Sequence, residues 1–393
     1  MDCTLEQATA HSRCVRAVPQ SNGLFSRATR VDRVLIEGDV PAVYALKDVW
    51  RQTCRRRDNP IHQYCTRTGK DSRGMVRSLE LFSSHSQHGH SYRQTNSTDG
   101  DNDLAERRHL RALITPVGIP LTTYPNTKSL VNGLRAAVHH HLIAYEAGVL
   151  HRNVNEGNII FDEVTLEAFL VSFDYAELTP RGLERLSARV LDANEDKYTT
   201  SDKRFNELSG TFPFLAIQLL RATPESRVIH NAGHDLESVY WLLVWIILRH
   251  TEHTLDSNAC HELFDRDLST AANHKDAWLS KPTPLDANHP LYIVAEHLRH
   301  LVTLQNPVVR PPPPAIPGLP PIPSRPVDQA VEISHALVLA IFDAVLSMPG
   351  WPENDKARPF VAQARSLSNS RARRSEARIP SSEATSRLQF QVI

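Results

Sequence analysis

The fold is decided by residues 149 to 161, which read Val149-Leu150-His151-Arg152-Asn153-Val154-Asn155-Glu156-Gly157-Asn158-Ile159-Ile160-Phe161. The apolar residues that open the stretch follow a helix-like segment, and those that close it have the composition of a buried strand. Polar residues and a glycine lie between them, as in a turn. The stretch therefore predicts the end of a helix, a loop that presents polar side chains, and a buried strand.

The length and composition of the chain exclude some classes of protein. The chain has 393 residues, which is long enough for two lobes with tails outside the core. Lys and Arg total 44, as do Asp and Glu, so the formal net charge is zero and we expect neither nucleic acid nor membrane as a partner. The most apolar run, Val239 to Leu248, is too short to span a bilayer, and the N-terminus has no apolar signal core.

The cysteines indicate the compartment. There are five, they are scattered, and they form no CxxC pair, which favours a reducing environment over a disulfide framework or a zinc site. The basic cluster Arg371-Ala-Arg-Arg374 is a weak nuclear-import candidate. We therefore expect an intracellular protein, cytoplasmic or nuclear.

The first third of the chain predicts a small sheet. Apolar runs bounded by turn residues predict strands at 31–37, 42–48, 75–82 and 110–117. Residues 1–30 have no periodicity and are expected to be disordered. The polar stretch 83–103 is expected to be an exposed insertion, because it contains almost no apolar residues.

Helical patterns dominate the middle of the chain. Apolar residues recur near the 3.6-residue period from Thr127 to Ala147, with Thr127 or Ser129 as the cap and Gly148 as the stop. Three consecutive histidines, His139 to His141, point in different directions, and we expect them on the helix surface. Residues 233–249 are apolar nearly all round, which predicts a central buried helix.

The last part of the chain is biased in composition. Residues 307–326 are rich in proline and predict an extended, solvent-exposed linker, with a contact to an SH3 or WW domain as the alternative use of the PxxP pairs. Residues 327–348 have the pattern of an amphipathic helix. Ser366 to Arg387 are charged and rich in Ser and Arg, which is typical of a disordered tail.

Taken together, these segments resemble the fungal-type protein kinase family, and the matching parts occur in family order across most of residues 31–305. The resemblance rests on His-Arg-x-x-x-x-x-Asn at His151–Asn158, and on Tyr44–Trp50, Thr115–Leu121, Phe173–Ala176, Gly210–Leu220 and Gly233–Ser238. It implies an α+β, two-lobed protein-kinase-like fold with a reduced β-rich N-lobe and a mainly helical C-lobe. It also implies ATP and Mg²⁺ as cofactors and Ser or Thr hydroxyls of a protein as acceptors.

The resemblance also divides the chain. We expect a disordered segment at 1–30, a degenerate kinase N-lobe at 31–118 with its insertion at 83–103, a C-lobe at 119–305, a Pro-rich linker at 306–326, a C-terminal helix of the C-lobe at 327–350 and a mostly disordered tail at 351–393.

The family assigns roles to individual residues. The catalytic loop would contribute His151, Arg152, Asn153 and Asn158. The nucleotide site would contain Lys47, Asn158, Ser172 and Asp174, and Mg²⁺ would be held by Asn158 and Asp174. The structural positions are Asp235, expected beside the backbone of His151-Arg152, and Gln218, which stands where the family carries a Glu in an ion pair.

Two departures from the family pattern fall on the chemistry. Asn153 stands where the catalytic Asp would accept the proton of the substrate hydroxyl, and losing a general base typically costs about 10²–10⁴ in rate. Ser172 stands where the main Mg²⁺ ligand should follow the apolar strand 169–171, and a hydroxyl is a poor ligand for a hard cation. Strand alternation would put Asp174 on the same side, so Asp174-Tyr175-Ala176 could act as a shifted Asp-Phe-Gly.

Further departures concern the supporting parts. No Gly-rich loop precedes Lys47, and residues 51–65, where the family has a helix Glu that pairs this Lys, contain no Glu. We therefore expect Lys47 to have no carboxylate partner on a neighbouring helix or elsewhere in the small lobe. Three hypotheses follow: a pseudokinase that acts by binding a protein partner, a slow Ser/Thr kinase that uses Asp174, and a non-functional remnant with a truncated small lobe.

Overall fold

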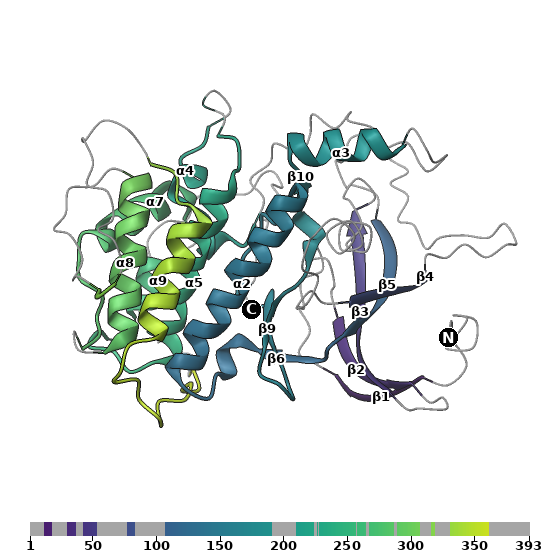
Figure 1. Cartoon of the computed structure of the whole chain (residues 1–393), viewed down its shortest axis with the longest axis horizontal. Helices are drawn as coiled ribbons and strands as arrows, with labels where there is room; N and C mark the ends of the chain where they lie inside the picture. The colour runs from purple at the N-terminus through teal and green to yellow at the C-terminus, as the bar shows by residue number, and fades with distance from the viewer. Residues whose placement is uncertain are drawn as a thin grey trace, which may run out of the picture.

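The computed structural model places two lobes side by side, a sheet and a larger helical body (Figure 1). The α+β, two-lobed fold class predicted from the sequence is confirmed. The residues that the structure describes are 12–17, 30–36, 42–52, 77–82, 107–190, 210–223, 226, 228–256, 258–264, 267–286, 289–306, 316–318 and 331–360. The expected helix segment at 51–65 falls outside them after Gln52, and so do the insertion 83–103 and the basic cluster at 371–374.

The small lobe is an antiparallel sheet whose strands lie in the order β1-β2-β3-β5-β4. Its strands are β1 (Ser12–Ala17), β2 (Arg30–Ile36), β3 (Ala42–Gln52), β4 (Arg77–Phe82) and β5 (Arg107–Thr115). All four predicted strands are present. Lys47 lies on the central strand β3, between Val31 of β2 and Ala112 of β5.

The expectation that residues 1–30 are disordered is wrong for Ser12–Ala17, which form the edge strand β1. Half of the segment is polar and its apolar residues do not alternate, so its sequence alone carries little strand signal. Pairing with β2 supplies the hydrogen bonds that local composition does not reveal. The sheet therefore has one strand more than predicted.

The large lobe is built around α2 (Thr127–Ala147) and α5 (Ala232–His250). The other helices are η1 (Leu121–Thr123), η2 (Phe173–Tyr175), α3 (Pro180–Val190), η4 (Phe212–Phe214), α4 (Ile217–Leu220), α6 (Ala259–Leu263), α7 (Leu268–Leu279), α8 (Pro290–Gln305) and α9 (His335–Leu346). Small sheets join them, one of β6 (Gly118–Pro120), β8 (Ile159–Asp162) and β9 (Ala168–Leu170), the other of β7 (Val149–Leu150) and β10 (Glu177–Leu178).

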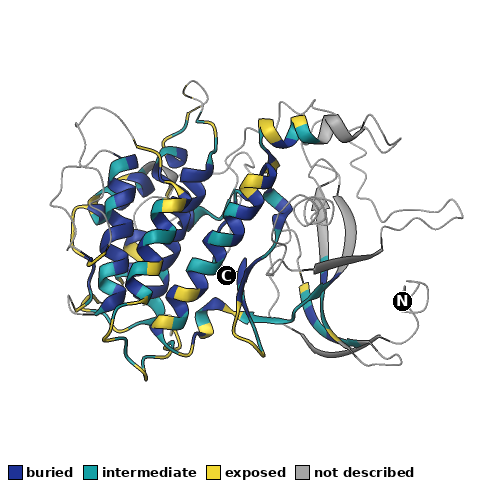
Figure 2. Cartoon of the chain, viewed as in Figure 1, coloured by how far each residue is buried: buried dark blue, intermediate teal, exposed yellow. Residues whose placement is uncertain are grey.

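The predicted central helix is confirmed as α5. Residues 239–248 are buried except for the half-buried Trp245, and α5 packs against α2, α6 and α8. Buried residues are concentrated in the helices of the large lobe (Figure 2). Among the described helices, none combines the length and the apolar character that crossing a membrane requires.

The ends of α2 differ in one respect from the prediction. Gly148 ends the helix in a left-handed conformation, with φ of 97°, as predicted. The cap is Asn126, not Thr127 or Ser129, because the Asn126 side chain accepts a hydrogen bond from the Ser129 backbone N–H at 2.8 Å. Thr127 is committed elsewhere, since its backbone N–H donates to Asp355 at 3.1 Å.

Three expectations for the C-terminal part need correction. The last helix begins at His335, not near residue 327, because Ser334 caps it by accepting from the Leu337 N–H. Ile316, inside the proline-rich block expected to be exposed, is 5% exposed and belongs to the core. Residues 351–360, expected in the disordered tail, pack on the large lobe.

The segment 351–360 is held by backbone bonds to the ends of two helices. Ala357 N–H donates to the Tyr124 carbonyl before α2 at 3.1 Å, and Arg358 N–H donates to the His250 carbonyl at the end of α5 at 2.8 Å. The Trp351 indole N–H donates to the Val345 carbonyl of α9 at 3.2 Å. Composition could not reveal these bonds, because backbone groups donate and accept whatever the side chains are.

Candidate functional site

The loop 151–158 connects β7 to β8 and is anchored at its start by α5. Asp235, in the first turn of α5, accepts a hydrogen bond from the Arg152 backbone N–H at 2.9 Å, as predicted. Arg152 has a φ of 64°, a left-handed conformation that is uncommon for a non-glycine residue. Its side chain forms an ion pair with the exposed Glu177 at 2.5 Å. The anchor fixes the backbone turn that precedes Asn153.

Buried histidines surround Asp235. Its carboxylate lies 2.8 Å from His141 Nε2 and 2.9 Å from His230 Nε2, and His141 Nδ1 lies 2.7 Å from His335 Nε2. Burial by itself would raise the pKa of Asp235, but the proximity of His230 and the hydrogen bonds from both histidines hold that pKa well below its ordinary value. The anchor of the loop is therefore an ionised carboxylate whose partners reach α9.

The expectation that His139 to His141 lie on the helix surface is wrong for two of them. His140 is 7% exposed and His141 is 3% exposed. His140 stacks on Phe169 of β9, and His141 bonds to Asp235. Periodicity indicated only that the three side chains point in different directions. It could not indicate that β9 and α5 cover two of those directions.

His151 supports the loop from inside. It is fully buried, its Nε2–H donates to the Val171 carbonyl at 3.0 Å, and its Nδ1 accepts from the Asn153 backbone N–H at 3.3 Å. Burial lowers its pKa to about 4, so the ring is neutral near neutral pH. The ring also meets Phe173 edge-on, with centroids 4.8 Å apart. His151 therefore positions the loop against the segment that carries Ser172.

Asn153 is held by two neighbours that the sequence analysis did not select. Its Oδ1 accepts from the Thr211 hydroxyl at 2.9 Å and from Asn155 Nδ2 at 3.1 Å. Asn155 Nδ2 also donates to Thr211 Oγ1 at 2.8 Å. Both neighbours lie in segments on which the family resemblance rests, Asn155 in His151–Asn158 and Thr211 in Gly210–Leu220. Their place in these segments is the signal in the sequence that could have identified them. The side chain at the predicted base position is thus an amide in a fixed orientation.

Asn158 closes the loop. Its Nδ2 donates to the Asn153 carbonyl at 2.8 Å, and its own carbonyl accepts from the Val171 N–H at 2.8 Å. Because the amide nitrogen is the donor, the Oδ1 atom faces the other way and can accept a cation. Asn158 therefore links the loop to the strand before Ser172 and keeps one oxygen for a ligand.

Lys47 brings the small lobe to this site. Its ammonium lies 2.9 Å from Asp174 Oδ2 and 3.1 Å from Ser172 Oγ, and Lys47 and Asp174 are each about 5% exposed. The expected absence of a carboxylate partner on a neighbouring helix is wrong, because Asp174 lies in the short 3-10 helix η2 of the large lobe. That expectation considered only carboxylates near Lys47 in the sequence.

Ser172 and Asp174 do reach the same ammonium, but not for the predicted reason. The strand β9 ends at Leu170, so alternation along a strand does not apply to them. Ser172 has a φ of 65°, and residues 173–175 form a 3-10 turn that carries Asp174 back toward Lys47. A non-glycine residue in this region costs about 1–3 kcal/mol. The neighbouring contacts offset this strain.

The structural position Gln218 has polar partners in place of the ion pair that its family counterpart would form. Its Oε1 lies 3.0 Å from His234 Nε2, and its Nε2 donates to the Gln305 carbonyl at 3.0 Å. These bonds connect α4, α5 and α8. Gln218 thus links α4 to α5 and α8 through neutral hydrogen bonds.

A buried carboxylate next to it was missed by the sequence analysis. Glu237 accepts from Ile217 N–H, Trp241 Nε1, Gln305 Nε2 and Asn306 Nδ2, at 2.8 to 2.9 Å. Burial raises its pKa, and these hydrogen bonds oppose the rise. Its donors come from segments distant in the sequence, so only the fold reveals them.

The residues at the loop fit a metal-bound nucleotide in part. Asn158 Oδ1 and the Asp174 carboxylate are oxygen ligands of the kind Mg²⁺ prefers, and Lys47 could face a phosphate. Across the described ranges, no group of three or more His, Cys, Asp or Glu side chains could hold a metal by itself. A cation here would therefore depend on phosphate oxygens to complete its coordination.

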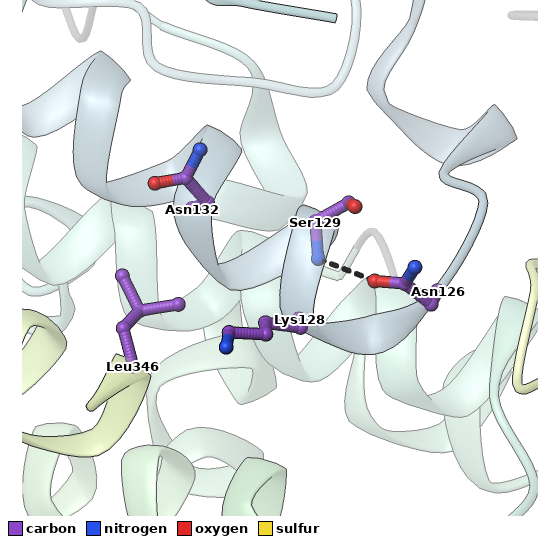
Figure 3. Close-up of a pocket in the computed structure, with 5 residues that line it drawn as sticks. All are labelled: Asn126, Lys128, Ser129, Asn132 and Leu346. Atoms are coloured by element: carbon purple, nitrogen blue, oxygen red, sulfur yellow. Dashed lines mark hydrogen bonds between the residues drawn. The ribbon is translucent and has the colours of Figure 1, made fainter. Parts of the chain in front are cut away.

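A pocket of about 350 Å³ lies elsewhere, at the first turns of α2 and the end of α9. It is lined by Asn126, Lys128, Ser129, Asn132 and Leu346 (Figure 3). The loop 151–158 follows the opposite end of α2, a helix of 21 residues, which is roughly 30 Å away at 1.5 Å per residue. The pocket is thus separate from the candidate site.

A two-lobed fold, a His-Arg-x-x-x-x-x-Asn loop anchored by Asp235, and a strand lysine that faces it define a protein-kinase-like domain. Residues 60–247 match the family described as fungal protein kinase, so this part of the chain is similar to the kinase-like domain of that family. Lys47 precedes the matched range, so its assignment rests on the geometry above.

Among solved structures, the chain is similar to the kinase PK-1 of the Cydia pomonella granulovirus, with 10% sequence identity and a TM-score of 0.40. That similarity covers 74% of this chain and 85% of the viral chain. No curated protein matches the chain.

Proposed function

We propose that this kinase-like domain is a pseudokinase, which binds a nucleotide weakly, acts by binding a protein partner, and transfers no phosphate above background. The observation that carries the proposal is Asn153. An amide takes up no proton near neutral pH, and its Oδ1 already accepts bonds from Thr211 and Asn155. The position that should remove the proton of the acceptor hydroxyl therefore has no basic atom to offer.

The metal side of the site supports the same proposal. Phosphoryl transfer in this fold depends on positioning and on charge neutralised by metal ions. Ser172 supplies a hydroxyl where a carboxylate is expected, and the Asp174 carboxylate faces the Lys47 ammonium at 2.9 Å. Nucleotide binding would use Lys47, Asn158 and Asp174, with ATP and Mg²⁺ as the cofactors. The Lys47–Asp174 contact must then rearrange to admit phosphate, which weakens the affinity.

The test is a nucleotide titration with and without Mg²⁺, together with a phosphotransfer assay on a generic Ser/Thr protein substrate. We expect weak binding and no transfer. Transfer by the unaltered protein, abolished by Asp174→Ala, would overturn the pseudokinase proposal. It would establish the second candidate, an active but slow Ser/Thr kinase. That candidate is favoured by one observation, the buried Asp174 carboxylate beside Lys47.

The partner of a pseudokinase is a protein, and we place the interaction inside the cell. The proline-rich segment 307–326 supplies one candidate contact, with an SH3 or WW domain. Because Ile316 is buried in the core, such a domain would use the PxxP pairs from Pro320 onward. A pull-down with SH3 and WW domains, compared with a variant in which Pro320 and Pro323 are Ala, tests this contact.

A further inference from the structure

The orientation of the Asn153 amide follows from a chain of hydrogen bonds that starts at a backbone donor. The Gly157 backbone N–H donates to Asn155 Oδ1 at 2.9 Å. A backbone N–H can only donate, so this atom of Asn155 must be its oxygen. The Asn155 Nδ2 group is therefore the one that faces Thr211 and Asn153.

The next link is the Thr211 hydroxyl. It accepts from Asn155 Nδ2 at 2.8 Å, and its single proton is then donated to Asn153 at 2.9 Å. The atom of Asn153 that receives this proton, and a second one from Asn155, must be Oδ1. The Asn153 Nδ2 group consequently points away from both neighbours. Within the described residues it has no hydrogen-bond partner, and it is not among the fully enclosed polar atoms.

The site therefore presents a donor at the point where a base is expected. The same site contains two oxygen ligands for a cation, Asn158 Oδ1 and the Asp174 carboxylate, together with the Lys47 ammonium. Asn158 Nδ2 donates to the Asn153 carbonyl at 2.8 Å, and Lys47 lies 2.9 Å from Asp174. A donor, an ammonium and a cation site complement an anion rich in oxygen. The neutral hydroxyl group of a Ser or Thr substrate carries no charge for the ammonium or the cation to balance.

We propose that Asn153 Nδ2 binds a terminal phosphoryl group. Two sources share this chemistry, the last phosphate of a nucleoside triphosphate and the phosphate of a phosphorylated Ser side chain. The inference rests on the proposed function, because it identifies which phosphoryl group, that of the nucleotide or that of a phosphorylated protein, binds at the same site. It gives Asn153 a role in binding, whereas its family counterpart removes a proton.

The experiment compares ATP with ADP in the presence of Mg²⁺, and O-phosphoserine with serine, by titration calorimetry on the full chain. In Asn153→Asp the donor becomes an anion, while Thr211 and Asn155 can still donate to the other oxygen, so the fold should persist. A hydrogen bond to a charged group corresponds to about a tenfold or larger change in affinity. We expect Asn153→Asp to weaken ATP by that factor and to leave ADP unchanged. The control is Asn258→Asp, the same change at an exposed helix cap without a side-chain bond.

The outcomes separate the two proposals. Weakening of ATP alone assigns the nucleotide source. If O-phosphoserine binds better than serine and Asn153→Asp removes the difference, while ATP and ADP respond alike, the product side is assigned. If ATP and ADP bind the unaltered protein but Asn153→Asp changes both equally or neither, and O-phosphoserine behaves as serine does, the inference is overturned and nucleotide binding stands. If no probe binds, both fail.

Discussion

The ammonium of Lys47, on the central strand of the small lobe, lies 2.9 Å from the carboxylate of Asp174 in the large lobe. Both side chains are about 5% exposed. A second ion pair between the lobes joins Arg33 of β2 to Glu163 of the β8–β9 turn, and it is more exposed. The buried pair therefore couples the stability of the domain to the residues that a nucleotide would need.

Removing the carboxylate should destabilise the domain strongly. Asp174→Ala leaves the Lys47 ammonium buried without its counter-charge, and breaking a buried pair typically costs about 3–5 kcal/mol. We expect the free energy of unfolding in urea to fall by about 3 kcal/mol. The matched control is Asp343→Ala, which breaks the exposed pair with Arg135 and should cost less than about 1 kcal/mol. Equal losses in the two variants would contradict the energetic role of the Lys47–Asp174 pair.

Restoring the two missing carboxylates should create activity. The double variant Asn153→Asp with Ser172→Asp supplies a base and a metal ligand at the expected positions. A positioned base contributes about 10²–10⁴ in rate, so phosphotransfer should rise from background by at least that factor. The assay follows phosphate incorporation into a Ser/Thr substrate. Asn153→Asp with Ser172→Ala serves as the control that lacks the new metal ligand, and a double variant no better than this control would count against the assignment of Ser172.

Acid should destabilise the protein well above the pKa of ordinary carboxylates. Burial lowers the pKa of His140 and of His151 to about 4. Between pH 6.5 and 4 the unfolded chain therefore binds more protons than the folded one, so the free energy of unfolding falls as the pH falls through this window. Above pH 6.5 the stabilisation from the neutral rings is fully present. Urea unfolding at a series of pH values measures this slope.

A single substitution should reduce that slope. His140 Nδ1 accepts from the Leu170 backbone N–H at 3.4 Å, and the oxygen of an asparagine could take the same proton. His140→Asn removes one titrating group, which should lower the slope by up to about 1.4 kcal/mol per pH unit. A slope identical to that of the unaltered protein would show that His140 titrates alike in the folded and unfolded states.

Asp355 bonds to Thr127, the first residue of α2, and should stabilise that helix. Asp355 accepts from the Thr127 backbone N–H at 3.1 Å and from the Thr127 hydroxyl. We expect Asp355→Ala to lower the free energy of unfolding by about 1 kcal/mol, the usual cost of losing a helix cap. Asp355→Asn keeps an acceptor and should lose about half as much. If both variants match the unaltered protein in urea, the contact contributes nothing to stability.

The sequence predicted those parts of the fold that carry local signals. The helix from Thr127 to Ala147 shows its period and its glycine stop, and α5 is apolar nearly all round. The strand β1 was missed because its partner, not its composition, makes it a strand. The segment 351–360 was missed for the same reason, since its bonds are made by backbone groups.

The candidate site divides in a similar way. Motif spacing brought His151, Asn153 and Asn158 into one loop, and the family resemblance predicted the contact between Asp235 and the Arg152 backbone. The resemblance put Lys47 and Asp174 in one nucleotide site, but it did not predict their direct ion pair, since the two residues are 127 positions apart and meet only in the fold. The burial of His140 and His141 was equally invisible, since it depends on which elements cover a helix face. The motifs identified which residues form the candidate site. Contacts between segments distant in the sequence determine which of those residues are buried and which are paired with a charge.

The segment 351–360 gives the order of biosynthesis a role in folding. Its backbone bonds tie Tyr124, before α2, to His250, at the end of α5. A chain emerging from the ribosome makes α2 and α5 long before it makes these residues, and domains generally fold as units during synthesis. The large lobe must therefore remain without these two backbone hydrogen bonds until residue 358 has left the exit tunnel.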